Sequence, residues 1–407
     1  MTIAASLIAF VAGLPLGLVL VGSAPGGIWE QRFDFPDSPL SQALRQPLML
    51  GLFLPIQAGG WGASTLPRTT DWGFDYNAAL VRQAEDLGFD LVFGRSQWLP
   101  KGGYGGVLNG QALDSFISLA AMAAITQRIM LISTVHVLYG PWHPLHFAIF
   151  GATLDHIAKG RWGVNVVTGH RSVEHEMFGW SRINHDHRYE LAAEFLSVVE
   201  RLWSETENFS YEGSRWRLQD AFVTPKPAFG RPVIVNATGS DAGIDFAARY
   251  SDIVFMTSPT GSEIESALAS LPAHVARIKA AARARGREIR TLINPMVFCR
   301  ETESETRAYY QAIVDHADPA TRPRGFGRFD GDAHAWRGRA IHDGPNNRAV
   351  GGKIQIVGPP EQVADCIRRL KNVGIDGIQL SFYDFKPDLT LFGERVLPLL
   401  KQAGLRH

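Results

Sequence analysis

The sequence predicts a single α/β domain built as a (β/α)8 barrel of the TIM type. From Leu48 onward, short β-rich runs alternate with amphipathic helical stretches, which is the pattern of βα units around a parallel sheet. Most of the runs are almost continuously apolar, as expected for strands that are covered on both faces. A barrel also accommodates a chain of 407 residues as one domain, because it places more than about 250 residues around a single core.

Eight strand candidates and the helical stretches between them fit a closed barrel better than an open sheet. The strand candidates are residues 48–54, 90–94, 129–135, 162–168, 233–236, 253–257, 291–298 and 377–382. The helical stretches include residues 76–88, 112–127, 186–203, 242–250, 263–285 and 361–373.

Two segments depart from this alternation. Residues 209–226 alternate aromatic and polar side chains around Glu212-Gly213, which predicts a β-hairpin insertion. Residues 315–348 are rich in Gly, Arg, Asp and Pro and are too polar for the core. We interpret them as a long lid-like loop. In that hypothesis Arg322, Arg324 or Arg339 meets an oxyanion of the substrate.

The first 46 residues form an apolar extension that we separate from the barrel of residues 47–407. No charged side chain occurs before residue 30, and residues 3–21 approach the ~20 apolar residues that span a bilayer. A secretory signal should begin with a basic region, and none precedes the apolar run. The extension is therefore dispensable, a membrane anchor or a cleaved export segment. We expect a cytoplasmic enzyme, with a membrane tether as the open alternative.

Charge and cysteine content narrow the class of protein. The 40 basic and 40 acidic side chains balance, so nothing favours nucleic acid or an acidic membrane surface. Cys299 and Cys366 lie far apart without His or Cys neighbours at ligand spacing, which argues for a reducing compartment and against a disulfide or zinc site. The His pairs lack the HExxH pattern of a metal site, and we expect no metal.

Polar side chains follow several strand candidates where the active site of such a barrel lies, at the C-terminal ends of the strands. Ser96 and Gln97 follow the second strand, and His136 ends the third. Asn165 lies inside the fourth strand, and Glu174 comes shortly after it. The chain shows neither a nucleophile elbow nor a Walker loop, so these groups do not belong to either of those catalytic schemes.

The segment NATGSDAG, residues 236–243, is a small-residue turn between the fifth strand and a helix. Its backbone N–H groups and the Ser240 hydroxyl would lie at the positive end of that helix and could cradle a phosphate. The alternative is a plain βα turn with Ser240 or Asp241 as the N-cap. The glycine spacing is not that of a dinucleotide-binding fingerprint.

With WGVNVVTGHRSVEHEMFG (162–179), HDHRYEL (185–191) and NATGSDAG, the sequence resembles the bacterial luciferase-like, flavin-dependent monooxygenases. The resemblance covers nearly everything from Leu48 to Arg406. Within the family the sequence is most similar to the group that contains dimethylsulfone and pyrimidine monooxygenases. The resemblance implies a barrel that binds reduced FMN and O2 at one mouth.

The resemblance also implies roles for individual residues. Ser240 would bind the FMN phosphate, and His136 would lie near the flavin as the catalytic group. A buried, fully hydrogen-bonded core histidine is the alternative for His136. Arg188 suits a second phosphate contact because a guanidinium matches phosphate geometry, although a salt bridge to Glu194 is also open. The remaining implied FMN contacts are Ser96, Gln97, Asn165, Glu174 and Tyr189.

The implied reaction is the FMNH2-dependent oxygenation of a small organic substrate, with an organosulfur compound such as a sulfone favoured and a nitrogen heterocycle second. A deazaflavin-dependent oxidoreductase and a catalytically silent flavin-binding barrel are the rival classes. No second nucleotide-binding domain is visible, so we expect a separate NAD(P)H:flavin reductase to supply the reduced flavin. The family also implies a homo-oligomer. Candidate walls of the pocket are Trp61, Trp98, Tyr139 and Trp142.

Overall fold

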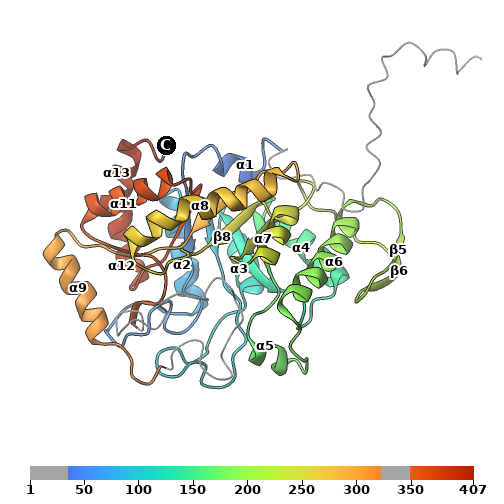
Figure 1. Cartoon of the computed structure of the whole chain (residues 1–407), viewed down its shortest axis with the longest axis horizontal. Helices are drawn as coiled ribbons and strands as arrows, with labels where there is room; N and C mark the ends of the chain where they lie inside the picture. Colours follow the sequence, from blue (N-terminus) through green and yellow to red (C-terminus); the bar gives the residue numbers. More distant parts are fainter. Residues whose placement is uncertain (1–34, 322–348) are drawn as a thin grey trace, which may run out of the picture.

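The computed structural model describes residues 35–321 and 349–407, and its centre is a closed barrel of parallel strands in the order β1-β12-β9-β8-β7-β4-β3-β2 (Figure 1). The predicted fold class is therefore confirmed. The barrel strands are β1 Met49–Phe53, β2 Leu91–Phe93, β3 Met130–His136, β4 Trp162–Val167, β7 Val233–Ala237, β8 Ile253–Met256, β9 Arg290–Ile293 and β12 Gly377–Leu380.

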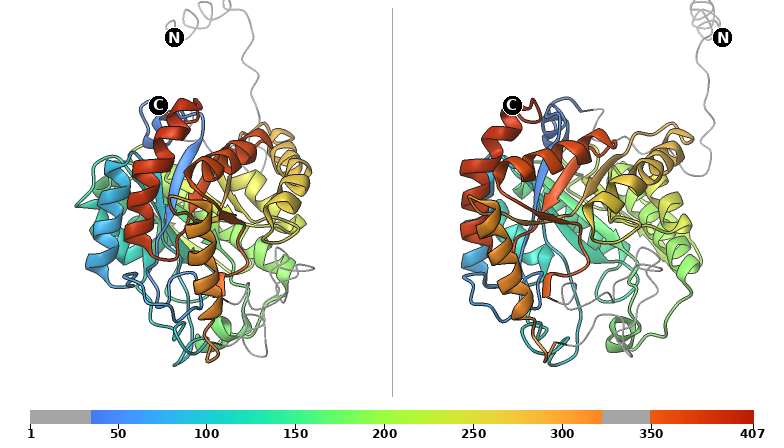
Figure 2. Two further views of the ribbon diagram at one scale, coloured as in Figure 1. Left: turned by 90° about the vertical axis from the view of Figure 1, so that its left-hand side faces the viewer. Right: turned by 60° about the vertical axis from the view of Figure 1, so that its left-hand side comes forward.

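Helices surround the strands, as the two views of Figure 2 show. Each of the six helical stretches named from the sequence corresponds to a helix of the structure. The helices and turns are α1 Pro39–Ala43, α2 Phe74–Asp86, α3 Ser115–Ala123, α4 Pro144–Ile157, α5 Ser172–Met177, α6 His185–Ser204, α7 Asp241–Tyr250, α8 Ile264–Arg283, α9 Glu303–Asp315, α11 Pro360–Asn372, α12 Phe385–Leu391, the π-turn η4 Phe392–Val396, and α13 Leu397–Gln402.

One strand prediction was wrong in its extent. Residues 291–298 are not a single strand, because β9 ends before Asn294-Pro295 and a separate strand, β10 (Met296–Phe298), follows. A proline has no N–H to donate to a ladder, which explains the interruption. β10 pairs in parallel with β11 (Gln355–Val357) outside the barrel. The predicted hairpin is confirmed as the antiparallel pair β5 (Phe209–Glu212) and β6 (Arg217–Ala221).

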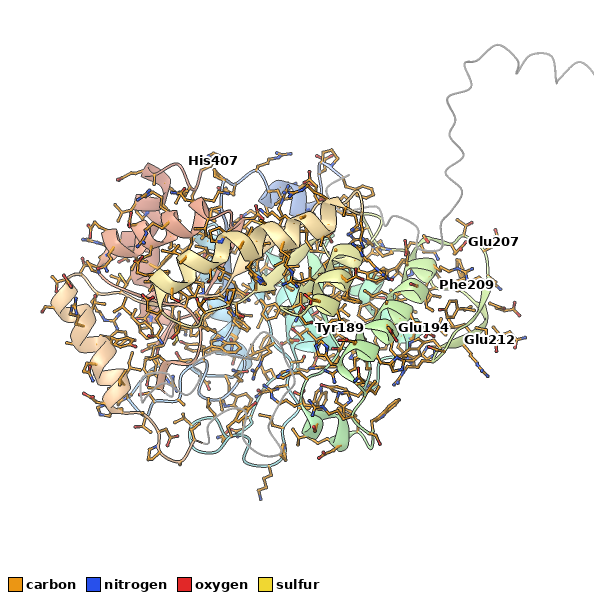
Figure 3. The ribbon with its side chains drawn as sticks, viewed as in Figure 1. Tyr189, Glu194, Glu207, Phe209, Glu212 and His407 are labelled. Atoms are coloured by element: carbon orange, nitrogen blue, oxygen red, sulfur yellow. The ribbon has the colours of Figure 1, made fainter. Side chains whose placement is uncertain are left out.

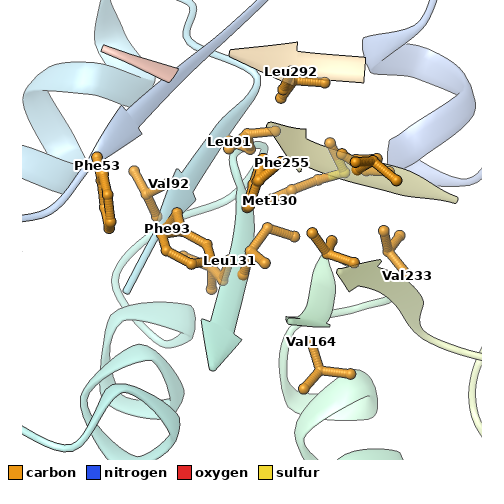
Figure 4. Close-up of a cluster of buried hydrophobic side chains, with 14 of the residues drawn as sticks. Phe53, Leu91, Val92, Phe93, Met130, Leu131, Val164, Val233, Phe255 and Leu292 are labelled. Carbon is orange, nitrogen blue, oxygen red and sulfur yellow. The ribbon is translucent and has the colours of Figure 1, made fainter. Parts of the chain in front are cut away.

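The register of the barrel decides which side chains face its interior. Phe53 pairs with Phe93, and Thr134 pairs with Asn165. Since paired residues of neighbouring strands point to the same face, these residues line the same interior. Figure 4 shows Phe53, Phe93 and Phe255 within one buried apolar cluster. Their rings pack edge to face, with centroids 4.8 Å apart for Phe53–Phe93 and 4.7 Å for Phe93–Phe255.

The two ends of the barrel differ. The helix α5 and the long connections after β1 and β2 gather at one end, whereas α1 and the C-terminus lie at the opposite end (Figure 1). α1 packs on the barrel, because Leu40 and Ala43 are buried in the main core. Gln46 accepts a hydrogen bond from the backbone N–H of His407 at 3.0 Å. The division of the chain at residue 47 stays a prediction, but α1 must remain for the core to be complete.

Most of the apolar N-terminal extension and of the lid-like loop, residues 1–34 and 322–348, lies outside the described residues, and so do Arg322, Arg324 and Arg339. Within the two described ranges, no helix combines the length and the apolar character needed to cross a membrane. The beginning of the proposed lid is described. Asp318 accepts a hydrogen bond from the backbone N–H of Val107 at 2.7 Å, which joins it to the connection after β2.

Candidate active site

A buried ionic cluster lies where β3 and β4 lead into their connecting segments. Glu174, on α5, is fully buried and accepts hydrogen bonds from the Arg171 guanidinium at 3.0 Å and the Tyr139 hydroxyl at 3.1 Å. The Tyr139 ring stacks on His136, with centroids 4.9 Å apart and planes inclined by 24°. Gly169 has a positive φ of 74°, and a Cβ there would overlap the Tyr139 ring. Glycine at 169 therefore permits this close packing.

The cluster sets the charge state of its members. Burial alone would raise the pKa of Glu174, but Arg171, the neighbouring imidazoles and the Tyr139 hydroxyl together lower it to about 2. Burial lowers the pKa of His136 to about 4, against the opposing attraction of Glu174. Burial, followed by Glu174, raises the pKa of Tyr139 well above its ordinary value. At neutral pH the site therefore holds an ionised carboxylate beside a neutral imidazole and a neutral phenol.

A second group of polar residues joins the ends of β2, β3 and β4. The Ser96 hydroxyl donates to the carbonyl of Thr134 at 2.8 Å and lies 2.9 Å from the Ser115 hydroxyl. Asn165 donates from Nδ2 to the Thr134 hydroxyl at 3.2 Å. Thr134 in turn donates to the carbonyl of Gly94 at 2.9 Å. The structure therefore brings the predicted residues Ser96 and Asn165 together through Thr134, at one side of the barrel mouth.

Gln97 lies beside this group, and its side-chain oxygen accepts a hydrogen bond from Arg95. The Arg95 guanidinium lies over the Trp61 ring, 5.2 Å from its centroid. Trp61 itself donates its indole N–H to the carbonyl of Phe53 at 3.0 Å. The connections after β1 and β2 are thus linked across the mouth by one aromatic ring.

The segment 236–243 leads into the first turn of α7 and is the candidate anion cradle. Ser240 is the N-cap of α7 and accepts from the backbone N–H of Gly243 at 3.1 Å, so the capping interpretation of Ser240 is confirmed. A Cβ on Gly243 would overlap the Thr238 hydroxyl and lie 2.7 Å from the Tyr189 hydroxyl. Both hydroxyls therefore crowd the first turn of α7, where backbone N–H groups and the helix dipole favour a negative charge.

Tyr189, near the start of α6, faces this region, and Arg188 precedes it in the same helix. Arg188 is buried, donates to the carbonyl of Ile183 at 2.8 Å, and acts electrostatically on Tyr139. Glu194, one turn further on, accepts hydrogen bonds from the backbone N–H groups of Arg215 and Trp216 at 3.0 and 2.9 Å. Glu194 thus fixes the turn of the β5–β6 hairpin to α6, the helix that also carries Tyr189 (Figure 3).

A pocket of about 570 Å³ between α6 and α7 borders the same first turns. Its lining includes Tyr189 and Arg249 but also the carboxylates of Asp186, Glu190 and Asp245. This concentration of acidic groups repels a phosphate. We therefore place the anion cradle on the Thr238 side of α7 and not in this outer pocket.

Several buried polar atoms at the mouth have no hydrogen-bond partner among the described residues. They include His136 Nδ1, Asn165 Oδ1 and Thr238 Oγ1. Buried polar groups in folded proteins are almost always hydrogen-bonded, so their geometry fits a polar ligand that spans the mouth from β3 to α7. His136 is therefore not the fully hydrogen-bonded core histidine of the alternative hypothesis.

The four aromatic residues predicted to line the pocket have different surroundings. Trp61 and Tyr139 contact the polar groups of the mouth, as described above. Trp98 packs edge to face on Phe178, with centroids 4.9 Å apart. Trp142 instead packs against Phe116, a residue of α3, at 5.1 Å. Its role is therefore hydrophobic packing between helices.

The sequence assigned no role to four residues that the structure places at the mouth: Arg171, Thr238, Lys353 and Ser381. Arg171 and Thr238 lie inside the motifs that carry the resemblance, and proximity to Glu174 and Ser240 would have pointed to them. No local sequence pattern indicates Lys353. It lies just before β11, and its Nζ donates a hydrogen bond of 2.9 Å to the hydroxyl of Ser381, the residue after β12.

A parallel barrel that gathers polar groups at the C-terminal ends of its strands has the architecture of the TIM-barrel enzymes, whose active sites lie at that end. A family model described as luciferase-like monooxygenase matches residues 49–377. The chain therefore belongs to the luciferase-like monooxygenase family, which confirms the resemblance seen in the sequence.

Individual relatives agree with this membership. The chain is 33% identical over 369 residues to the FMNH2-dependent dimethylsulfone monooxygenase of Pseudomonas fluorescens, covering 88% of this chain and 96% of that protein. It is 31% identical over 364 residues to a pyrimidine monooxygenase of Escherichia coli K12, covering 88% and 92%. Among solved structures, riboflavin lyase with a modified FMN and riboflavin superposes with a TM-score of 0.78, at 25% identity over 89% of this chain and 93% of the other.

Proposed function

We propose that this chain is an FMNH2-dependent monooxygenase that uses O2 to oxygenate a small organic substrate, with a sulfone-like organosulfur compound favoured. The observation that carries the proposal is the set of buried, unpartnered polar atoms of His136, Asn165 and Thr238, which runs along the mouth to the anion cradle of α7. A flavin mononucleotide supplies both a polar ring edge and a phosphate. The names of the curated relatives, which specify FMNH2 for the dimethylsulfone enzyme, support this cofactor.

In this proposal the phosphate binds at the first turn of α7. Ser240 holds that turn in place, the Thr238 and Tyr189 hydroxyls provide hydrogen bonds, and Arg188 provides the positive charge. The ring edge contacts Asn165, Ser96 and Gln97 at the ends of β4 and β2. Glu174 acts indirectly, because it fixes Tyr139 and Arg171 in position.

When bound, reduced FMN supplies the activation of O2, which is chemistry of the cofactor and not of the chain. The chain orients the reactants and excludes water. His136, neutral at neutral pH, offers one unpartnered ring nitrogen that can exchange a proton or a hydrogen bond with the reacting groups. The apolar rings of Phe53, Phe93 and Phe255 close the floor of the pocket against water.

Two further substrate and cofactor classes were open from the sequence. A nitrogen heterocycle keeps support from the pyrimidine monooxygenase relative. A deazaflavin cofactor has less support, because the more similar relatives named for a flavin are FMNH2-dependent. We also propose that a separate flavin reductase supplies the reduced flavin and that the chain forms a homo-oligomer. Size-exclusion chromatography with light scattering would test the oligomeric state.

The experiment is O2 consumption by the full chain with a flavin reductase, FMN and NADH, with dimethylsulfone, with uracil, and without substrate. Substrate-dependent uptake with sulfinate formed supports the monooxygenase and the sulfur class together. O2 uptake that depends on uracil supports the flavin chemistry and indicates a nitrogen heterocycle as the substrate class. A chain that neither binds FMNH2 nor changes O2 uptake would contradict the proposal.

A further inference from the structure

A buried ammonium group lies at the side of the barrel mouth opposite the α7 cradle. Lys353 is only 9% exposed, and its Nζ lies over the rings of Trp61 and Phe53, at 4.1 and 4.3 Å from their centroids. The same Nζ donates to the Ser381 hydroxyl at 2.9 Å. Ser381 donates in turn to the carbonyl of Pro295 at 3.0 Å, so the ammonium is anchored to the segments that follow β12 and β9.

This corner is distinct from the residues proposed for the cofactor. Those residues come from the ends of β2, β3, β4 and β7 and from the first turns of α6. Phe53 ends β1, and Ser381 and Pro295 follow β12 and β9, so the corner lies on three neighbouring strands of the barrel. The corner is therefore in the half of the mouth that does not carry the proposed cofactor residues. Trp61 joins the two halves, because the Lys353 Nζ and the Arg95 guanidinium both lie over its ring, at 4.1 and 5.2 Å from the centroid.

A second hydrogen-bond donor faces the same interior. Gln379 precedes Ser381 by two residues on the path of β12, so the two side chains point to the same face of the sheet. Gln379 is buried, and its Nε2 has no hydrogen-bond partner among the described residues. An ammonium and an amide N–H are both donors, and an ammonium has no acceptor at all. The corner therefore suits a group that only accepts hydrogen bonds.

We propose that Lys353, with Gln379, is the specificity-determining element of this enzyme and binds the sulfonyl oxygens of the substrate. The inference rests on the proposed function and narrows its substrate class. A small alkyl sulfonyl compound matches both features of the corner: its oxygens accept from Lys353 and Gln379, and its alkyl carbon packs on Phe53 and Trp61. A pyrimidine presents N–H donors as well as carbonyl oxygens, and those donors would face the ammonium unpaired.

Both a neutral sulfone and a sulfonate anion carry sulfonyl oxygens, and the test distinguishes them. Isothermal titration calorimetry of the full chain measures the binding of dimethylsulfone, methanesulfonate and uracil, each with and without oxidised FMN. The variants are Lys353→Met, which keeps the apolar stem, Lys353→Arg, which keeps the charge, and Gln379→Leu. Lys386→Met is the matched control, because Lys386 also lies over a ring, that of Tyr76 at 4.6 Å, but is exposed.

We expect Lys353→Met to weaken binding of the preferred sulfonyl probe by about 10- to 100-fold, the loss typical of a charge-assisted hydrogen bond. Lys353→Arg should recover part of that loss, Gln379→Leu should lose about 10-fold, and Lys386→Met should change nothing. A larger loss for methanesulfonate than for dimethylsulfone identifies the anion as the preferred class. FMN binding should be unchanged in every variant.

Three results would overturn the inference: no binding of either sulfonyl probe to the wild-type chain, equal binding by wild type and Lys353→Met, or weakened FMN binding with intact probe binding. Circular dichroism identifies any variant that fails to fold, in which case Lys353→Arg and Gln379→Leu decide. The proposed function fails separately, through the absence of FMN binding and of O2 consumption in wild type. Sulfonyl binding that depends on Lys353 would stand even then.

Discussion

Replacing Glu174 with glutamine tests whether the buried ionic cluster holds the site together. The substitution keeps the shape of the side chain but leaves the Arg171 guanidinium without its carboxylate, 3.0 Å away in the wild type. Breaking a buried ion pair by removing one partner costs about 3–5 kcal/mol, because the remaining charge stays desolvated.

The pKa of Glu174 gives an independent magnitude. A carboxyl whose pKa falls from 4.5 to about 2 on folding contributes roughly 3 kcal/mol of stability, at about 1.4 kcal/mol per pH unit. Because the folded pKa is the lower one, this stability is fully present above pH 4.5 and is lost as the pH falls through about 2. At pH 3 roughly half of this contribution remains.

The assay is urea unfolding of wild type and Glu174→Gln at pH 7 and pH 3. We expect the variant to lose roughly 3 kcal/mol of unfolding free energy at pH 7 and about half of that at pH 3. Glu176→Gln is the control, because Glu176 is exposed on the same short helix and should change stability by less than about 0.5 kcal/mol. A Glu174→Gln variant as stable as wild type, or a loss of the same size at both pH values, would refute the reasoning.

Three other outcomes follow from the same geometry. The unfolded chain protonates His136 near pH 6.5, whereas the buried imidazole has a pKa of about 4, so wild type loses unfolding free energy as the pH falls from about 6.5 to 4. His136→Gln should reduce this loss, and urea unfolding at pH 7, 5 and 4 measures it. Gly243→Ala should weaken FMN binding by about 10-fold or more, since the new Cβ would displace the Thr238 and Tyr189 hydroxyls, whereas Ala242→Ser should not; calorimetry compares the two. A chain begun at residue 47 should melt at a lower temperature than one begun at residue 35, because it loses the burial of Leu40, worth about 2 kcal/mol.

The barrel could be predicted from the sequence because its strands are covered on both faces. A strand such as β8, Ile253–Met256, then appears as an apolar run, and helices such as α7 and α11 have one apolar face. The run 291–298 shows where this reasoning stops. Its apolar residues belong to two different sheets, and an apolar pattern alone does not reveal that the chain changes partners at Asn294-Pro295.

The site was predicted in part for a similar reason. Ser96, Asn165 and Ser240 stand at the ends of strands, so their positions follow once the barrel is assumed. The polar contacts that give them their chemistry join distant segments, as in the pair of Ser96 and Thr134. Such pairs depend on the register between strands, which a single sequence does not encode locally. The family motifs supplied Glu174 and Tyr189, which strand positions alone would not select as cofactor contacts.

The arrangement of charges explains why the two halves of the mouth have different roles. On the α5 side, Arg171 pairs with the carboxylate of Glu174, and burial keeps His136 and Tyr139 neutral. On the β12 side, Lys353 meets a hydroxyl and two aromatic rings. In the proposal, the sulfonyl oxygens of the substrate bind on the β12 side, and His136 faces the cofactor on the α5 side. Specificity and cofactor chemistry then depend on different residues, and variants of Lys353 and of His136 should separate the two experimentally.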